Sequence, residues 1–385
     1  MAESTTHLAH TIKVKNSCED LTFARFILLS GLSFVVTWVA IWAYIVTFPM
    51  LYQDRDYPLA LAKQDLLAQC QLNRVVVFGD SKAVAGILPT AMSIPVENLA
   101  FPAATPIETY FLVKRLLRCP EAPRLVIIAH STIMYSRDKF FWSIAANSGI
   151  LNRRDMRDVV AEARNLNDIE LENAERPSSV PYAFLPELYA ARFPPLYFAN
   201  LLGGYVAARW RYNERAYQEA ISSYGRSSFG TAASSDGVSD EAQMDNWRPS
   251  PLINFYLNRT LGLLASHHVP VVMMTLPINA ATCSHLPPTV QARFSVYLER
   301  IAQNNANIVL TDAAIPCWPD RFFGDDMHFN MSGAVTYSHK LQSVIAEILN
   351  KRENLTAFNP DNQQLMVAWT NSRLREPAGE EAPDD

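Results

Sequence analysis

The longest uninterrupted apolar stretch of the chain lies near its N-terminus. No charged residue occurs from Phe26 to Gln53, and a helix that crosses a bilayer needs about 20 predominantly apolar residues. We therefore expect residues 26–51 to form a transmembrane helix. A cleavable signal peptide is the alternative, but its apolar region would be only about 7–15 residues long and would end in small residues. Here the stretch ends in Phe48-Pro49-Met50-Leu51.

Basic residues on one side of this stretch set its expected orientation. Lys13, Lys15 and Arg25 precede it, so the positive-inside rule places residues 1–25 in the cytoplasm. We expect the first part of that segment, which is polar, to be mobile. The protein is then a single-pass protein of the inner (cytoplasmic) membrane, anchored by one helix. Its main domain, residues 57–350, is expected to be periplasmic, or extracytoplasmic in general.

Short continuous apolar runs recur in the rest of the chain and predict buried β-strands. The clear runs cover residues 74–78, 125–129, 269–274 and 308–310, and a weaker one covers 96–99. Runs that are apolar on both faces are typical of parallel strands covered by helices. Helical stretches separate the clear strands, and this alternation predicts an α/β fold with a parallel sheet and right-handed crossovers.

One long segment, residues 137–250, does not fit the alternation. It contains no convincing strand, several prolines and a Ser/Gly-rich loop, so we expect a helical insertion between two strands of the sheet. Aromatic residues recur along its last helix and just past it: Tyr205, Trp210, Tyr212, Tyr217 and Tyr224. Packing in the core of the insertion is the expected role, and a carbohydrate-stacking face is the alternative. Residues 372–385 form an acidic tail that we expect to be disordered.

The charge balance and the spacing of metal-binding residue types exclude several functions. A formal net charge of −5 does not favour nucleic acid as a partner, because phosphate binding needs a basic patch. No Cys/His spacing indicates zinc, and no Gly-rich phosphate loop is present. We therefore expect no metal and no cofactor.

Two polar clusters lie where ligands bind in parallel α/β sheets, beyond the carboxyl ends of the strands. Gly79-Asp80-Ser81 follows the first strand directly, and Asp325-Asp326-Met327-His328-Phe329-Asn330 lies past the last one. A serine on a tight turn after a strand becomes a nucleophile when an imidazole takes its proton and a carboxylate orients that imidazole. We expect Ser81, His328 and Asp325 to fill these roles, with Asp326 as the alternative carboxylate.

These clusters resemble the motifs of the SGNH/GDSL-like hydrolase superfamily. Val77-Phe78-Gly79-Asp80-Ser81 is similar to the first block of that family, and Asp325 with His328 to the last. The segment Asn98 to Ala104 stands where the second block lies. The family has a glycine there whose N–H lines the oxyanion hole, and this chain offers Ala103 or Ala104 instead.

The third family block, Gly-x-Asn-Asp, is absent from this chain. Ala129-His130-Ser131-Thr132 stands in its place, so His130 or Ser131 is expected to replace the usual Asn donor. The resemblance covers about residues 72–132 and 266–348. The expected oxyanion and near-site residues are Asp80, Ala103, Ala104, His130, Ser131 and Asn330.

A narrower resemblance rests on the N-terminal anchor, the missing third block and the helical insertion. In these features the chain is similar to the SGNH-like proteins of alginate acetylation and of teichoic-acid D-alanylation. That resemblance implies an O-acyltransferase, with acetyl the expected group, for an exported polysaccharide or cell-envelope polymer. It also implies a multi-spanning membrane-bound O-acyltransferase as partner. A membrane-tethered esterase that removes acyl groups, and a non-catalytic scaffold on the same fold, are the alternatives.

The cysteines test the fold through the strand order that the resemblance implies, the flavodoxin-like order 2-1-3-4-5. Cys18 lies on the cytoplasmic side, and the other four lie outside, where disulfides persist. In this order Cys70 and Cys119 lie at the amino edge of neighbouring strands, and Cys283 and Cys317 at the carboxyl edge of two others. The expected bridges are Cys70–Cys119 and Cys283–Cys317. Four free thiols in the core are the alternative.

Overall fold

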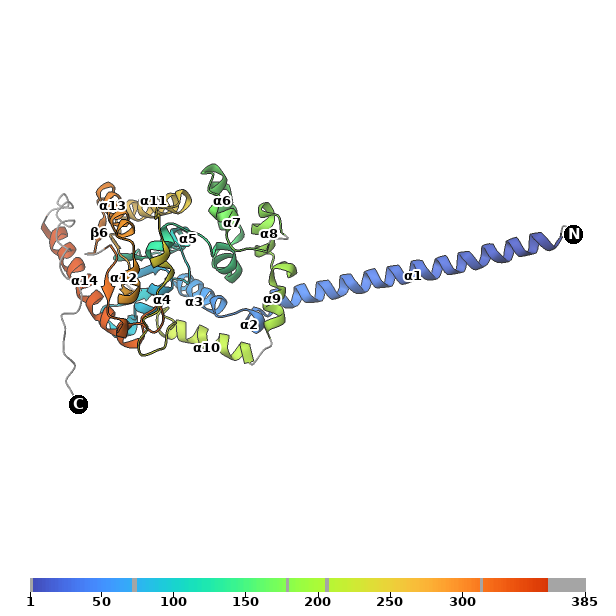
Figure 1. Cartoon of the computed structure of the whole chain (residues 1–385), viewed down its shortest axis with the longest axis horizontal. Coiled ribbons are helices and arrows are strands. Elements are labelled where there is room, and N and C mark those ends of the chain that lie inside the picture. Colours follow the sequence, from blue (N-terminus) through green and yellow to red (C-terminus); the bar gives the residue numbers. More distant parts are fainter. Residues whose placement is uncertain (1–2, 71–74, 178–179, 205–207, 312–313, 359–385) are drawn as a thin grey trace.

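The computed structural model describes residues 3–70, 75–177, 180–204, 208–311 and 314–358. The acidic tail expected at 372–385 and the aromatic residue Tyr205 lie outside these described residues. Within them, a long N-terminal helix projects from a mixed α/β body, and the body's helices surround a sheet (Figure 1).

The projecting helix, α1, covers Glu3–Thr47, and its stretch Thr22–Thr47 is long and apolar enough to cross a membrane. Helix begins at Glu3, so the N-terminal segment expected to be mobile is helical, and its mobility stays a prediction. No proline before Pro49 and no glycine before Gly31 interrupts the helix. The helix ends at Thr47, before the expected 51, since Pro49 cannot continue it and instead begins the short helix α2, Pro49–Tyr52.

Five parallel strands form the main sheet in the order β2-β1-β3-β4-β6. Their bounds are Val75–Gly79 for β1, Val96–Asn98 for β2, Leu125–Ala129 for β3, Val271–Met273 for β4 and Ile308–Leu310 for β6. Every residue of β1, β3 and β4 is buried, as their apolar sequences require, and β2 is buried as well although it contains Glu97 and Asn98. The α/β class with a parallel sheet is therefore confirmed.

A second, two-stranded sheet was not expected from the sequence. It pairs β5, Ile278–Asn279, in parallel with β7, Cys317–Trp318. Strands this short leave no run of apolar residues to detect. Because β5 stands outside the main sheet, that sheet follows 2-1-3-4-6 in chain numbering rather than 2-1-3-4-5.

Helices cover the sheet and connect its strands. α5 packs on α11, and α4 packs on α14. Their bounds, with those of the other helices outside the insertion, are Asp56–Gln69 for α3, Ser81–Gly86 for α4, Pro89–Ala91 for η1, Pro106–Leu116 for α5, Thr132–Tyr135 for η2, Pro251–Ser266 for α11, Ala280–His285 for α12, Pro288–Asn304 for α13, Asp320–Phe322 for η7 and Met331–Phe358 for α14.

The described part of residues 137–250 contains helices and loops and no strand. Its helices α6 to α9 lie at the end of the body from which α1 emerges, and α10 leads away from that end (Figure 1). α9 packs on α1 and α2, while α10 packs on α2 and α3. The helical segments are Phe141–Ala146 (η3), Arg153–Asn165 (α6), Glu170–Asn173 (α7), Tyr182–Phe184 (η4), Leu185–Ala190 (α8), Pro194–Gly204 (α9), Arg209–Ser222 (α10) and Asp240–Gln243 (η6).

The aromatic residues of α10 do not form the core of the insertion, so that expectation was wrong for most of them. Trp210, Tyr212 and Tyr224 are exposed, and Tyr217 is half-buried with its hydroxyl donating to Asp65 at 2.7 Å. α10 is rich in charged residues and buries Asn213 and Ala220, so only one side of it packs against α2 and α3.

Both expected disulfides are present. Cys70 and Cys119 are bridged with their Cα atoms 5.4 Å apart, and Cys283 and Cys317 with theirs 6.0 Å apart. The first bridge joins the end of α3 to the chain after α5. The second joins α12 to β7, next to the small sheet.

Candidate active site

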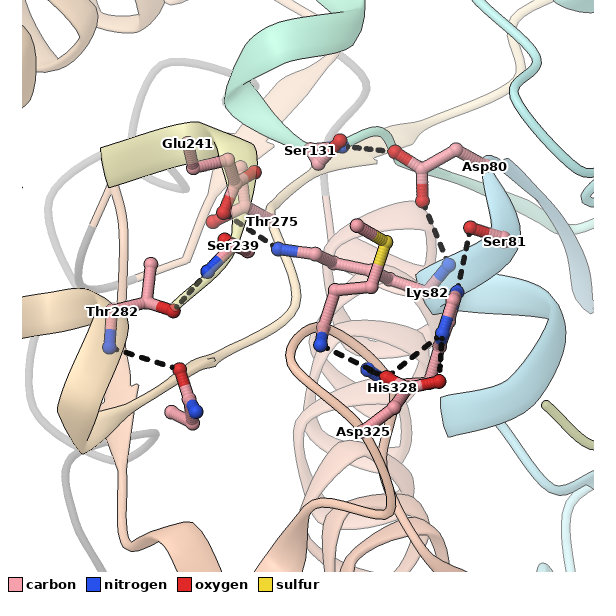
Figure 2. A network of polar contacts seen from close by, with 12 residues as sticks. Asp80, Ser81, Lys82, Ser131, Ser239, Glu241, Thr275, Thr282, Asp325 and His328 are labelled. Atoms are coloured by element: carbon pink, nitrogen blue, oxygen red, sulfur yellow. Dashed lines mark hydrogen bonds and ion pairs between the residues drawn. The ribbon is translucent and has the colours of Figure 1, made fainter. Parts of the chain in front are cut away.

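Ser81, His328 and Asp325 form one hydrogen-bonded chain (Figure 2). Ser81 is the first residue of α4, separated from β1 by Asp80 alone, and its Oγ lies 2.8 Å from Nε2 of His328. Nδ1 of the same ring lies 2.8 Å from Oδ2 and 3.1 Å from Oδ1 of Asp325. The three side chains thus have the connectivity of a Ser-His-Asp catalytic triad.

The loop before α14 fixes the carboxylate under the imidazole. Oδ1 of Asp325 accepts hydrogen bonds from the backbone N–H groups of Met327 at 2.9 Å and His328 at 2.6 Å. Burial alone would raise the pKa of Asp325, but the hydrogen bonds and charge of His328 outweigh it and hold that pKa below its usual range. No hydrogen bond in the described part of the chain joins the alternative residue, Asp326, to His328.

Asp80 holds the serine turn in place. Its buried carboxylate accepts from the backbone N–H of Lys82 at 2.9 Å, as the N-cap of α4, and from that of Ser131 at 2.6 Å. One side chain therefore joins the chain after β1 to the chain after β3. Gly79 is needed beneath it, because a Cβ there would lie 2.3 Å from the carbonyl oxygen of Ala129.

Two backbone N–H groups remain available beside Ser81 for an oxyanion. The ladder between β1 and β2 continues beyond β2, with Phe101 N–H donating to Gly79 O at 2.9 Å, so Ala103 comes to the same edge as Ser81. Within the described residues, neither the Ser81 nor the Ala103 N–H makes a hydrogen bond. The Ala104 N–H is engaged with Phe101 O at 3.0 Å. Ala103 has a φ of 52°, a left-handed conformation that costs an L-residue roughly 1–2 kcal/mol.

The other expected near-site residues are engaged elsewhere. The His130 ring is fully buried with Nε2 2.9 Å from Oγ1 of Thr109 on α5, and burial lowers its pKa to about 4 despite the charge of Asp80. The backbone N–H of Ser131 is occupied by Asp80. Asn330 donates to Ala233 O and Arg321 O at 2.8 Å each, so it braces loops instead of facing Ser81.

The insertion contributes residues to the site that the sequence analysis did not identify. Phe229 stacks on the ring of His328, with ring centroids 4.9 Å apart and an interplanar angle of 24°. The guanidinium of Arg55, which directly precedes α3, lies 4.6 Å from the centroid of the Phe229 ring. No local pattern marks Phe229, which lies far from both triad clusters in the chain.

A close backbone approach ties the insertion to the loop that carries Asp325. A Cβ on Gly230 would lie 2.4 Å from the carbonyl carbon of Gly324 and 2.6 Å from the nitrogen of Asp325. Only glycine permits this contact, and the Ala232 N–H donates to Gly324 O at 3.2 Å beside it.

A buried ion pair makes a second link between the insertion and the site (Figure 2). Nζ of Lys82, the residue after Ser81, lies 2.6 Å from Oε2 of Glu241 on η6, and both side chains are almost completely buried. The loop before η6 is held in turn by Asn279, which donates to Ser235 O and Gly237 O, and by Thr282, whose hydroxyl accepts from Ser239 N–H.

A cavity of about 140 Å³ borders Phe229 on the side of α3 and α10. Arg55, Asp56, Tyr212 and Arg215 are among its lining residues. Burial, with the neighbouring charge of Asp54, raises the pKa of Asp56 to about 6. The lining of the cavity therefore combines two aromatic rings, two carboxyl groups and two guanidinium groups, and its Phe229 stacks on the imidazole of His328.

No group of three or more His, Cys, Asp or Glu side chains among the described residues is arranged to hold a metal ion. Comparison with known proteins finds no matching family model and no curated protein of significant similarity. The site offers a serine, an imidazole and a carboxylate in series, and two backbone N–H groups, of Ser81 and Ala103, that make no hydrogen bond within the described residues.

Proposed function

We propose that this protein is an extracytoplasmic O-acyltransferase of the SGNH type that modifies an exported polysaccharide or cell-envelope polymer. The observation that carries the proposal is the hydrogen-bonded series Ser81–His328–Asp325 at the carboxyl edge of the parallel sheet. The spanning-length helix α1 and the two disulfides support an extracytoplasmic location at the inner membrane.

In the first half-reaction, Ser81 Oγ attacks the acyl carbonyl of the donor while His328 Nε2 takes the serine proton. The N–H groups of Ser81 and Ala103 are proposed to stabilise the oxyanion. Collapse of the tetrahedral intermediate breaks the bond to the donor's leaving group, which receives the proton from His328. The product of this step is an acyl ester of Ser81.

In the second half-reaction, an acceptor hydroxyl attacks the Ser81 ester and gives its proton to His328. Collapse releases the acylated acceptor, and the proton returns to Ser81 Oγ. Asp325 holds Nδ1 of the imidazole throughout and stabilises the imidazolium that forms in each half. The cavity beside Phe229 supports a sugar acceptor, because an aromatic ring with charged neighbours suits a polyhydroxylated ligand. A multi-spanning membrane-bound O-acyltransferase is the proposed source of the acyl group.

A membrane-tethered esterase is the second candidate, and partial exposure of Ser81 favours it, because water can then reach the acyl-enzyme. The full-length protein would be incubated with p-nitrophenyl acetate, with and without an oligosaccharide acceptor. Mass spectrometry would locate the acetyl group. A transferase gives acetylated oligosaccharide and faster p-nitrophenol release with acceptor, whereas an esterase gives free acetate at an unchanged rate. If the wild type acquires no acetyl group at Ser81 and matches a folded Ser81→Ala variant, the site is a scaffold and the proposal is wrong.

A further inference from the structure

Aromatic contacts join the apolar helix α1 to the insertion. Trp38 lies 5.9 Å, centroid to centroid, from both Phe193 and Phe198, and Trp42 lies 5.4 Å from Phe193. The indole N–H of Trp42 also donates to Ala191 O at 2.8 Å. The segment that makes these contacts, α9 with the residues just before it, therefore lies directly against the candidate membrane span.

The length of the span determines how deep these contacts must lie. Thr22–Thr47 has 26 residues, which at 1.5 Å each is about 39 Å, against about 30 Å of bilayer hydrocarbon. Trp38 precedes Thr47 by about 13 Å of helix. Even if the whole surplus of about 9 Å projects on the outer side, Trp38 remains about 4 Å inside the hydrocarbon. Phe193 and Phe198, which touch Trp38, must lie near the same depth.

The sequence of α9 fits such a position. No charged residue occurs from Phe193 to Ala208, and Leu202 is 81% exposed although its neighbours on the helix are apolar. Arg192 and Arg209 flank the stretch, and Trp210, which follows, is also exposed. An apolar helix bounded by arginine and tryptophan is the pattern of a segment that lies at a membrane interface.

We propose that α9 is a second membrane contact, which lies in the outer interface of the bilayer beside α1. Its 11 residues extend about 17 Å, too short to span, so the helix dips into one leaflet. The partner is lipid, because α9 continues the apolar surface of α1. The inference rests on the membrane location in the proposed function, but it does not depend on the chemistry.

This contact would fix the height of the active site above the membrane. α10 begins at Arg209, at the proposed interface, and runs for about 21 Å to Ser222. It leads from α9 back toward the body, on the side away from α1 (Figure 1), and the chain after it reaches Phe229 and His328. Two attachments, α1 and α9, would hold the domain in one orientation relative to the lipid surface.

The test measures depth in the full-length protein in nanodiscs of phosphatidylethanolamine and phosphatidylglycerol. A nitroxide would be attached through Leu202→Cys in a Cys18→Ser background. Val36→Cys in the span and Val296→Cys on α13, at the far end of the body, are matched controls, being exposed apolar positions. We expect the ratio of oxygen to nickel-chelate collision rates at residue 202 to resemble that at residue 36 and to exceed that at residue 296 several-fold.

A ratio at residue 202 equal to that at residue 296, with residue 36 protected, would overturn the proposal while leaving the anchor intact. Protection of residue 202 in cell membranes but not in nanodiscs would also overturn it, since the partner would then be a protein. Exposure of residue 36 to water would show that α1 does not cross the membrane, and the proposal for α9 would then be wrong as well. Hydrolysis of p-nitrophenyl acetate should be unchanged in Leu202→Asp, so loss of membrane contact and loss of catalysis are separable.

Discussion

Phe229 lies almost parallel to the ring of His328, 4.9 Å away, although the two residues belong to the insertion and to the loop before α14. Asp325 limits the rotation of the imidazole through Nδ1, and Phe229 limits its tilt. The insertion is thus a structural part of the site. The Phe229 ring also keeps bulk water from one face of the His328 imidazole.

Replacing Phe229 tests this positioning role. We expect Phe229→Ala to lower kcat for ester hydrolysis by about tenfold, the equivalent of about 1.4 kcal/mol, because a loosely held imidazole spends less time aligned with Ser81. Phe229→Tyr should retain activity, since the ring remains. Thermal unfolding of both variants controls for a general loss of structure. A fall in kcat that is equal for Ala and Tyr would contradict a role for stacking.

The sequence sufficed for those parts of the fold and site that continuous patterns encode. Runs such as Val75–Phe78 identify strands because burial on both faces leaves no polar position. Ser81 follows such a strand closely, and Asp325 and His328 lie in one short loop before α14. The strand pair β5–β7 could not be predicted from the sequence, because a strand of two residues shows no recognisable pattern. Long-range contacts could not be predicted for a different reason. Nothing in the sequence around Phe229 or Glu241 indicates that these residues contact His328 and Lys82.

Polar residues beside a motif were the least predictable part of the site. Asp80 and Asn330 were expected near the reacting groups, and both satisfy backbone groups of neighbouring loops. His130 occupies the position of a family donor in sequence, yet its ring points to Thr109. Buried backbone N–H and C=O groups need partners as strongly as ligands do, so composition alone does not separate the two roles.

The ion pair between Lys82 and Glu241 gives a stability prediction with an internal control. Removing one member leaves a buried charge without its partner, so Lys82→Met or Glu241→Leu should each lower the free energy of unfolding by about 3–5 kcal/mol. The double variant replaces the pair by apolar groups and should recover most of that loss. Urea unfolding of the four proteins is the measurement. If the double variant is as unstable as the sum of the singles, the pair is not an isolated electrostatic unit.

The buried carboxyl group of Asp138 should make the stability of the protein depend on pH. Its carboxylate is buried with no hydrogen-bond partner in the described structure, and burial, with the charge of Asp168, raises its pKa to about 8. A folded-state pKa above the unfolded value means that the native protein binds the extra proton. The contribution of Asp138 to the free energy of unfolding is therefore fully present below about pH 4, the pKa of an unfolded Asp. It is lost as the pH rises from there through about 8, by up to about 1.4 kcal/mol per pH unit.

The variant Asp138→Asn isolates this group, because it keeps the shape and cannot ionise. We expect the variant to gain stability relative to the wild type as the pH is raised from 5 to 9. Urea midpoints of both proteins at pH 5, 7 and 9 would show the difference, and groups common to both proteins cancel. Parallel midpoint curves would mean that Asp138 ionises normally in the folded protein.

The two disulfides should differ in what they protect. Each closes a loop of comparable length, with sequence separations of 49 and 34 residues, so each should stabilise the protein by roughly 3–4 kcal/mol. Cys70–Cys119 lies at the amino edge of the sheet, away from the triad. Cys283–Cys317 joins α12 to β7, and α12 carries Thr282, which holds the loop of Glu241.

Loss of the second bridge should therefore loosen the site as well as the fold. We expect Cys70→Ala/Cys119→Ala to lower the unfolding midpoint and to leave kcat for ester hydrolysis unchanged at a temperature where the variant is folded. Cys283→Ala/Cys317→Ala should lower the midpoint similarly and also reduce kcat several-fold, because η7 and the loop to His328 follow directly after β7. Equal kcat values in the two variants would show that the backbone contacts at Gly230 and Gly324 hold that loop without the bridge.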